Sequence, residues 1–243
     1  MIKAVLFDLD GTLLPMDQRA FTDLYMNSLA AKMATLGCDP KDFLCAMGKG
    51  IAAMIGNDGT VTNQERFWQA FCEELGEEAR AYESVIDGYY AGDFLKIRFV
   101  CGYTPEAKKT VDRIHSLGLD TVLATNAVFP PIGAETRLRW SGLEPKDFRY
   151  ITTYDNSHYC KPNPAYFQEI ADKLGLLPQE CLMVGNDVED DMTAEQTGMK
   201  VFLLFGCLRN AKAKNLSRYP QGGFQDLLDY IISENGQKES LPC

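Results

Sequence analysis

Residues 4–13 read AVLFDLDGTL, an apolar run that leads into two aspartates and a glycine. The short, continuous apolar run at 4–7 is typical of a strand buried on both faces, as in a parallel sheet covered by helices. Asp8 ends the run, and Asp10 with Gly11 has the composition of a turn. Ligands of open α/β sheets bind beyond the carboxyl ends of the strands, so these acidic residues stand where a site is expected.

The chain from about residue 103 onward alternates between predicted helices and strands. Strands are predicted at 121–124, 150–153, 181–184 and 201–205. Helices are predicted at 104–118, 135–140, 163–175, 191–197 and 224–232, and the tail at 235–243 is expected to fray. This alternation predicts an α/β fold with a Rossmann-like, doubly wound parallel sheet and right-handed crossovers.

Residues 15–98 show only helical patterns. The predicted helices are 17–36, 40–55, 64–75 and 77–95. The sequence TNQE at 62–65 is a capping box ahead of the third helix. We therefore predict a helical cap domain at 15–98, inserted into a core domain that comprises residues 1–14 and 99–243.

Acidic residues are in excess along the chain: 34 Asp and Glu against 24 Lys and Arg give a formal charge of −10. Such a surface repels nucleic-acid backbones and anionic membranes, so we expect no nucleic-acid partner and no membrane partner. No stretch approaches the ~20 apolar residues of a membrane span, and the first residues lack the features of a signal peptide. The eight cysteines include no C-x-x-C pair, which argues against a zinc site. We predict a cytoplasmic protein with reduced thiols, whose oligomeric state the sequence leaves open.

Polar residues follow four of the predicted strands and would meet at one edge of the sheet. They are Asp8 and Asp10, Thr125 and Asn126, Lys161, and Asn186 and Asp187 with Asp191 one turn later. In an extended backbone, Asp8 and Asp10 point the same way and repel each other unless a cation lies between them. Mg²⁺ prefers such oxygen ligands, and Asp187 with the side-chain oxygen of Asn186 could complete its shell.

A carboxylate can attack phosphorus to form an aspartyl-phosphate, which water then hydrolyses. A second carboxylate could protonate the leaving oxygen and later deprotonate that water. The phosphoryl oxygens need donors, and Lys161, the Thr125 hydroxyl and the Asn126 amide could supply them. Asn126 also precedes a predicted helical segment, whose N–H groups favour anions.

These motifs resemble those of the haloacid dehalogenase-like (HAD) hydrolase superfamily. The resemblance rests on four motifs in the family's order: FDLDGTL at 7–13, ATN at 124–126, KPNPAYF at 161–167 and VGNDVEDD at 184–191. It implies that Asp8 is the nucleophile and Asp10 the acid/base, whose backbone carbonyl would also bind Mg²⁺. The helical insert resembles the C1 cap of the family's phosphatases, which closes over the active site.

The resemblance also implies roles for the later motifs. Thr125 and Lys161 would bind the phosphoryl group, Asp187 would bind metal, and Asp191 would support the site, for instance by orienting Lys161. Asn186 departs from the pattern, because many relatives carry an acidic residue there. A neutral amide removes one charge, so we expect weaker Mg²⁺ binding or more reliance on Asp187.

The residues predict a Mg²⁺-dependent phosphatase for a small phosphorylated metabolite. Two enzymatic alternatives stay open: a sugar phosphomutase, which the same first motif allows, and a dehalogenase, against which Asp10 argues because the family's dehalogenases lack an acidic residue there. A non-catalytic phosphate sensor on the same fold is the third alternative, because a fold does not guarantee an activity.

Overall fold

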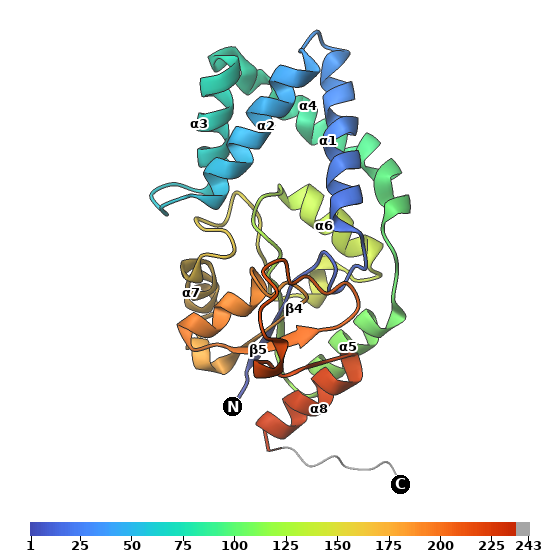
Figure 1. The fold of residues 1–243 in the computed structure, drawn as a ribbon, viewed down its shortest axis with the longest axis vertical. Coiled ribbons are helices and arrows are strands. Elements are labelled where there is room, and N and C mark those ends of the chain that lie inside the picture. Colours follow the sequence, from blue (N-terminus) through green and yellow to red (C-terminus); the bar gives the residue numbers. More distant parts are fainter. Residues whose placement is uncertain (237–243) are drawn as a thin grey trace.

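The computed structural model describes residues 1–236, and its centre is a six-stranded parallel sheet in the order β3-β2-β1-β4-β5-β6 (Figure 1). The strands are β1 (Ala4–Phe7), β2 (Asp120–Leu123), β3 (Tyr150–Ile151), β4 (Cys181–Gly185), β5 (Lys200–Leu204) and β6 (Gln221–Gly222). Phe7, the last residue of β1, is in register with Leu123 of β2 and Val184 of β4. The carboxyl ends of these three strands are therefore level, which brings their following loops together.

Helices cover both faces of the sheet, as the apolar strands require. On one face, α5 (Pro105–Ser116) packs against α8 (Phe224–Glu234). On the other face, α7 (Pro164–Leu174) packs against the 3₁₀ segment η5 (Asp191–Thr197) (Figure 1). Every residue of β1 and β4 is buried, so the core lies between the sheet and these two helical layers. The remaining elements of this part of the chain are α6 (Pro131–Trp140), η3 (Pro145–Asp147), η4 (Pro178–Glu180) and η6 (Leu216–Arg218). The predicted doubly wound α/β fold is confirmed.

The segment between β1 and α5 is helical throughout and lies over the carboxyl-end side of the sheet (Figure 1). Its elements are α1 (Gln18–Ala34), α2 (Pro40–Ile55), α3 (Asn63–Leu75), η1 (Glu77–Tyr82), α4 (Glu83–Ala91) and η2 (Asp93–Val100). Side chains of Asp17, Asp39 and Thr62 cap the first three helices, and Thr62 with Glu65 forms the predicted capping box. The exact division into a cap at 15–98 and a core at 1–14 and 99–243 stays a prediction.

Three details differ from the sequence predictions. The single helix expected at 77–95 is divided into three, and Gly92, at φ −130° and ψ −83°, ends α4 because its backbone is not helical. The strand expected at 150–153 stops after Ile151, because the side chain of Asn156 accepts the Thr153 N–H (2.9 Å) and turns the chain. The two-residue strand β6 was not predicted, because a Gln-Gly pair carries no strand signal.

The other differences are small. The helix expected from residue 135 begins at Pro131, whose ring suits the first helical position. The segment 191–197 is a 3₁₀ helix, and the expected fraying of 235–243 falls almost entirely outside the described residues. In the part of the chain that the structure describes, no helix has both the length and the apolar character needed to span a bilayer.

Candidate active site

A cavity of about 260 Å³ opens at the carboxyl ends of β1 and β4. Most of the predicted site residues line it: Asp8, Asp10, Asn126, Lys161, Asn186, Asp187 and Asp191. The Asp8 N–H donates to the carbonyl of Val184 (2.9 Å), which continues the β1–β4 ladder one residue past the strand. The backbone of Asp8 is thereby fixed, and its side chain projects from the end of the sheet.

Lys161 lies between two carboxylates at the centre of this cavity. Its Nζ atom donates to Asp8 Oδ1 (2.9 Å) and to Asp191 Oδ1 (2.6 Å), and its side chain is 2% exposed. Burial alone lowers the pKa of Lys161, but the charges of Asp191 and Asp8 outweigh burial and hold the pKa well above its usual range. Burial raises the pKa of Asp191 to about 7, opposed by the charge of Lys161 and assisted by that of Asp8. The lysine stays cationic beside the predicted nucleophile.

Asp10 forms an ion pair with Arg137, a residue of α6 that is completely buried. Arg137 Nε also donates to the carbonyl of Gly133 (3.3 Å), and its guanidinium carbon lies 3.9 Å from the centroid of the Phe129 ring. One carboxylate oxygen of Asp10 is buried without a hydrogen-bond partner among the described residues. Burial raises the pKa of Asp10, although the positive charge of Arg137 opposes that rise. The predicted acid/base is thus held from the side by a fixed cation.

The turn after β4 presents Asp187 and supports Asp191. The Asp187 carboxylate accepts the N–H groups of Glu189 (2.8 Å) and Asp190 (3.0 Å), and pairs with Arg209 Nη1 (3.0 Å). Its own N–H donates to Asp191 Oδ2 (3.0 Å). A side chain at Gly185 would place its Cβ 2.0 Å from the Asp191 carboxylate. The glycine that ends β4 is therefore needed to seat Asp191 beside Lys161.

Asn186 uses both ends of its amide in contacts with the chain. Its Nδ2 donates to the carbonyl of Cys207 (2.6 Å), and its Oδ1 accepts from the Thr12 hydroxyl (2.9 Å), which lies 3.2 Å from Asp8 Oδ2. Gly11 has a φ of +90°, and a Cβ there would lie 2.3 Å from Asn186 Nδ2. The predicted metal ligand Asn186 therefore also fixes the turn that follows Asp8.

The two predicted phosphoryl ligands after β2 are placed differently. Asn126 lines the cavity, and its Oδ1 accepts the backbone N–H of Lys161 (3.1 Å), which couples the two loops. Thr125 is buried but is not among the residues that line the cavity. Its carbonyl accepts from the hydroxyls of Thr152 (2.6 Å) and Tyr166 (2.8 Å), which anchors the loop from beneath.

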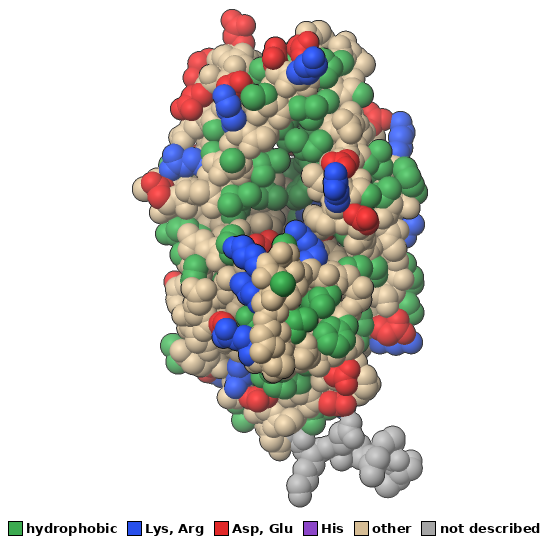
Figure 2. All heavy atoms as spheres, viewed as in Figure 1, with side chains coloured by type: hydrophobic (Ala, Val, Ile, Leu, Met, Phe, Trp, Pro, Cys, Tyr) green, Lys and Arg blue, Asp and Glu red, His purple; other side chains and the backbone are tan. Residues whose placement is uncertain are grey.

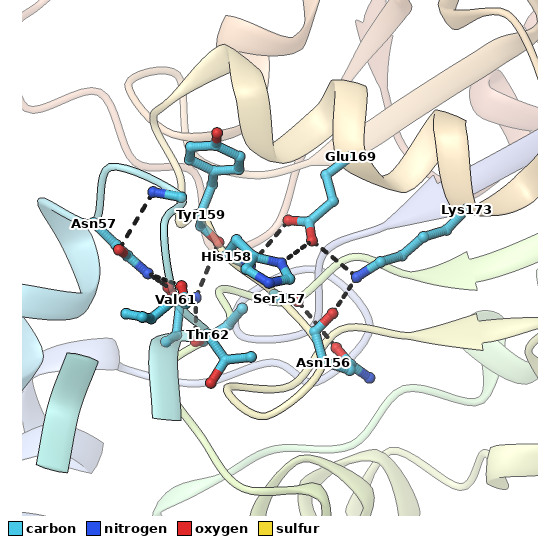
Figure 3. Close-up of polar contacts among 12 residues, drawn as sticks. Asn57, Val61, Thr62, Asn156, Ser157, His158, Tyr159, Glu169 and Lys173 are labelled. Atoms are coloured by element: carbon cyan, nitrogen blue, oxygen red, sulfur yellow. Dashed lines mark hydrogen bonds and ion pairs between the residues drawn. The ribbon is translucent and has the colours of Figure 1, made fainter. Parts of the chain in front are cut away.

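The first turn of α3 holds the loops that carry Asn126 and Lys161. The Asn63 side chain is fully buried and donates to the carbonyls of Ala127 (3.1 Å) and Tyr159 (3.1 Å). Its N–H donates to the carbonyl of Ser157 (2.8 Å), at the junction drawn in Figure 3. The helical segment is thereby fastened directly to both loops.

The same loop is fastened to α7 on its other side. His158 Nδ1 lies 2.8 Å from Glu169 Oε1, and Glu169 Oε2 accepts the N–H of His158 (3.0 Å). Lys173 Nζ donates to Glu169 (2.9 Å) and to the carbonyl of Asn156 (Figure 3). Three side chains of α7 and the loop therefore brace the chain just before Lys161.

Oxygen donors for a hard cation lie around the cavity: the carboxylates of Asp8 and Asp187, the carbonyl of Asp10 and the amide of Asn186. Within residues 1–236, no three Asp, Glu, His or Cys side chains are arranged as a metal-binding group. The site nevertheless fits a divalent cation, because a carboxylate has about four lone-pair sites and those of Asp187 are only partly used. Arg209 already supplies one positive charge at Asp187.

Sequence reasoning missed Arg137, Arg209 and Thr12 as members of the site. Arg137 lies within the helix predicted at 135–140, and the pattern of that segment assigns it no role in a site. Thr12 lies inside the motif at 7–13, and its closeness to Asp8 in the sequence could have indicated that it belongs to the site. Arg209 is separated from Asp187 by 22 positions, and no local pattern connects them.

The surface between the helical segment and the core is hollowed. Figure 2 shows this hollow near the middle of the molecule, with hydrophobic side chains along its upper part and Lys or Arg side chains at its lower rim. A further cavity of about 720 Å³ adjoins the cavity at Asp8 and Lys161, the predicted catalytic cavity, and shares Asp10, Gln18, Asn186 and Arg209 with it. The predicted catalytic groups can therefore be reached from solvent.

Curated proteins of similar sequence are phosphatases. A phosphoglycolate phosphatase of Aliivibrio fischeri is 28% identical over 213 residues, covering 84% of each chain. A phosphoglycolate phosphatase of Salmonella typhi is 25% identical over 213 residues, covering 81% of this chain and 79% of the relative. These relatives support the predicted phosphatase.

Solved structures share the fold. A predicted phosphoglycolate phosphatase from Haemophilus somnus has a TM-score of 0.58 at 22% identity and covers 95% of this chain and 98% of its own. A 2-haloacid dehalogenase from Pseudomonas syringae has a TM-score of 0.62 at 20% identity and covers 96% and 100%. The family model described as haloacid dehalogenase-like hydrolase matches residues 2–198. The chain belongs to the haloacid dehalogenase-like hydrolases, as its four motifs predicted.

Proposed function

We propose that this hydrolase cleaves small phosphomonoesters with Mg²⁺, through an aspartyl-phosphate on Asp8, beneath a C1-type cap. The observation that carries the proposal is the contact between Asp8 Oδ1 and Lys161 Nζ (2.9 Å) in a cavity that Asp10 and Asp187 also line. A nucleophile, an acid/base, a fixed cation and oxygen ligands are the parts that phosphoryl transfer requires.

In the first step, a carboxylate oxygen of Asp8 forms a bond to phosphorus, and the bond from phosphorus to the leaving oxygen breaks. Asp10 gives its proton to that oxygen, which leaves as the alcohol. In the second step, a water oxygen attacks phosphorus while Asp10 takes the water proton. Phosphate leaves and the Asp8 carboxylate is restored. Lys161 stabilises the charge on the phosphoryl oxygens in both steps.

Asp8, Asp187, Asn186 and the carbonyl of Asp10 would hold Mg²⁺. When bound, Mg²⁺ neutralises the charge between the phosphoryl oxygens and the carboxylates. Asp191 acts through Lys161, because its carboxylate holds the ammonium group beside Asp8. Asn126 would complete the phosphoryl site from the loop after β2, and Thr125, which does not line the cavity, stays a prediction as a phosphoryl ligand.

The test is release of phosphate from p-nitrophenyl phosphate with Mg²⁺ or with EDTA. We expect activity only with the metal and a loss of about 10⁴-fold or more in Asp8→Asn, which removes the nucleophile. Asp229→Asn, at an exposed position of α8, is the matched control and should keep full activity. Acid-quenched wild-type enzyme should carry a phosphoryl group on the peptide that contains Asp8.

Other outcomes would identify the alternatives. Isomerisation of a sugar phosphate without net phosphate release indicates a phosphomutase. Halide release from 2-haloacids that resists EDTA indicates a dehalogenase. Phosphate binding without turnover of a broad phosphometabolite panel indicates a sensor, and each of these results contradicts the proposal.

We also propose that the protein works in the cytoplasm. The seven cysteines in the described part of the chain are free thiols, as a reducing compartment would keep them. Alkylation of intact cells followed by mass spectrometry should find these thiols reduced, and a disulfide among them would contradict the assignment.

A further inference from the structure

A smaller cavity lies beside the catalytic cavity, between the helical segment and the loops after β2 and β3. Its volume is about 50 Å³, and it shares Val128 and Phe129 with the catalytic cavity. Since one water needs about 10–15 Å³, the space can take a small compact group. Six of its thirteen lining residues are aromatic: Tyr25, Phe67, Trp68, Tyr90, Phe129 and Tyr154.

Phe129 stands at the boundary of the two cavities. Its ring centroid lies 5.4 Å from that of Tyr25 and 6.4 Å from that of Tyr90, on the side of the smaller cavity. The Arg137 guanidinium that packs on Phe129 is already paired with Asp10. The two cavities therefore adjoin at Val128 and Phe129, and a leaving group that extends from a phosphate at Asp8 past Phe129 would enter the aromatic cavity.

The charge around the smaller cavity is negative. Asp87 and Glu83 line it, and no Lys, Arg or His among the described residues does. Glu83 is paired with Arg80 (3.1 Å), whose guanidinium carbon lies 4.7 Å from the centre of the Trp68 ring. Asp87 is a solvent-exposed residue with no hydrogen-bond or ion-pair partner among the described residues, and partial burial, together with the charge of Glu83, raises its pKa. One carboxylate thus has no cation.

We propose that this cavity binds a compact ammonium group on the leaving alcohol, so that the preferred substrates are phosphomonoesters of amino alcohols. Aromatic faces attract alkylammonium groups, and an unpaired carboxylate adds to that attraction. The same surroundings repel a carboxylate, so a phosphorylated hydroxy acid, the substrate named for the curated relatives, fits this cavity poorly. The inference rests on the proposed function, because the phosphoryl group must sit at Asp8.

Four substrates with a two-carbon chain test the assignment. They are phosphoglycolate, ethyl phosphate, phosphoethanolamine and phosphocholine, which end in a carboxylate, a methyl, an ammonium and a trimethylammonium group. We expect kcat/KM for the two cationic esters to exceed that for ethyl phosphate about tenfold, and phosphoglycolate to be the poorest. A higher value for ethyl phosphate or phosphoglycolate than for both cationic esters overturns the inference.

Variants separate the local charge from the general acidity of the protein. In Asp87→Asn, the preference for phosphocholine over ethyl phosphate should fall at least threefold. Glu73→Gln removes the same charge from an exposed position of α3 that does not line the cavity, and should leave the preference unchanged. Equal effects of the two substitutions on this preference would show that the overall negative charge of the protein causes it, and would refute a local binding site.

Binding measurements keep this inference separate from the proposed function. If p-nitrophenyl phosphate is not hydrolysed, the proposed function fails, but the ammonium site is still tested by calorimetry. Phosphocholine should bind the Asp8→Asn protein about tenfold more tightly than ethyl phosphate does. If p-nitrophenyl phosphate is hydrolysed but the four esters show no preference, the proposed function stands and the ammonium site is refuted.

Discussion

Replacement of Arg137 by Met tests the ion pair that holds Asp10. Arg137 is completely buried, whereas the Asp10 side chain is 14% exposed and one of its oxygens has no partner. Methionine keeps much of the length of the side chain but removes the charge and the stacking on Phe129. The variant therefore leaves a carboxylate in a largely buried position without its cation.

The size of the effect follows from that burial. Removal of one partner of a buried ion pair costs about 3–5 kcal/mol, and the lost stacking adds about 1 kcal/mol. Asp10 still faces the cavity, where water partly replaces the arginine, so we expect a loss of about 3 kcal/mol in the free energy of unfolding at pH 8. Asp10→Asn in the Arg137→Met background should recover most of the loss, because no uncompensated charge remains.

The pH dependence has a definite sign. Burial already raises the pKa of Asp10, and loss of Arg137 raises it further. A carboxyl whose folded-state pKa lies above its unfolded value binds more protons in the folded state, so stability falls as pH rises between the two values. The loss in Arg137→Met should therefore be smallest near pH 4 to 5 and largest at pH 8.

Urea denaturation in EDTA at pH 5 and pH 8 measures these losses. Arg139→Met is the matched control, because Arg139 lies two residues away on the exposed side of α6 and its surface pairs are worth about 1 kcal/mol or less. Equal losses at both pH values for Arg137→Met, or no recovery in the double variant, would refute the reasoning. Turnover adds a second criterion, since alkyl phosphates need a proton from Asp10 and should slow more than p-nitrophenyl phosphate.

Three further predictions concern the turns around the site. Gly11→Ala should lower the free energy of unfolding by about 2 kcal/mol or more, because Gly11 has a positive φ and a Cβ there would contact Asn186. Gly48→Ala, in open space within α2, should raise that free energy by about 0.5–1 kcal/mol. Equal effects of the two substitutions in denaturant unfolding would contradict this. Asn186→Asp should lower the Mg²⁺ concentration for half-maximal activity. In EDTA it should lower the free energy of unfolding by about 1–3 kcal/mol, because the carbonyl of Cys207 loses its donor. Unchanged Mg²⁺ activation would contradict the predicted metal role of Asn186. Arg209→Gln should lower that Mg²⁺ concentration about two- to fivefold, since a half-exposed cation no longer competes at Asp187, and a rise would contradict the competition.

The order of strands and helices could be predicted because local signals and the global fold agree. The apolar run at 4–7 and the capping box at 62–65 are signals that each act over a few residues. The predicted bounds of α2 match the structure, because Pro40 begins it and Gly56 follows it. Element ends that depend on contacts between side chains and backbone could not be predicted. Asn156, for example, ends β3 early through a side-chain hydrogen bond.

The residues of the site also differ in whether local sequence could predict them. Residues directly after strands could be predicted to meet, because parallel strands align their carboxyl ends, and Asp8, Lys161 and Asp191 do lie in contact. Arg137 could not be predicted, because its role depends on how α6 packs against the turn at Asp10. Neither the amino-acid composition nor the hydrophobic periodicity of a helix distinguishes a buried arginine from a solvated one.

The three cationic side chains around the site, Lys161, Arg137 and Arg209, differ in how tightly the structure holds them. This difference indicates which of them a metal ion could replace. The side chains of Lys161 and Arg137 are 2% and 0% exposed, so packing holds them at Asp8 and Asp10. The Arg209 side chain is 50% exposed and is held mainly by its pair with Asp187. A divalent cation at Asp187 would therefore displace Arg209 into water at a cost of about 1 kcal/mol or less. In the proposed mechanism Asp8 and Asp10 would keep their own partners while the charge at Asp187 changes, so we propose Asp187 as the ligand that the metal would reach first.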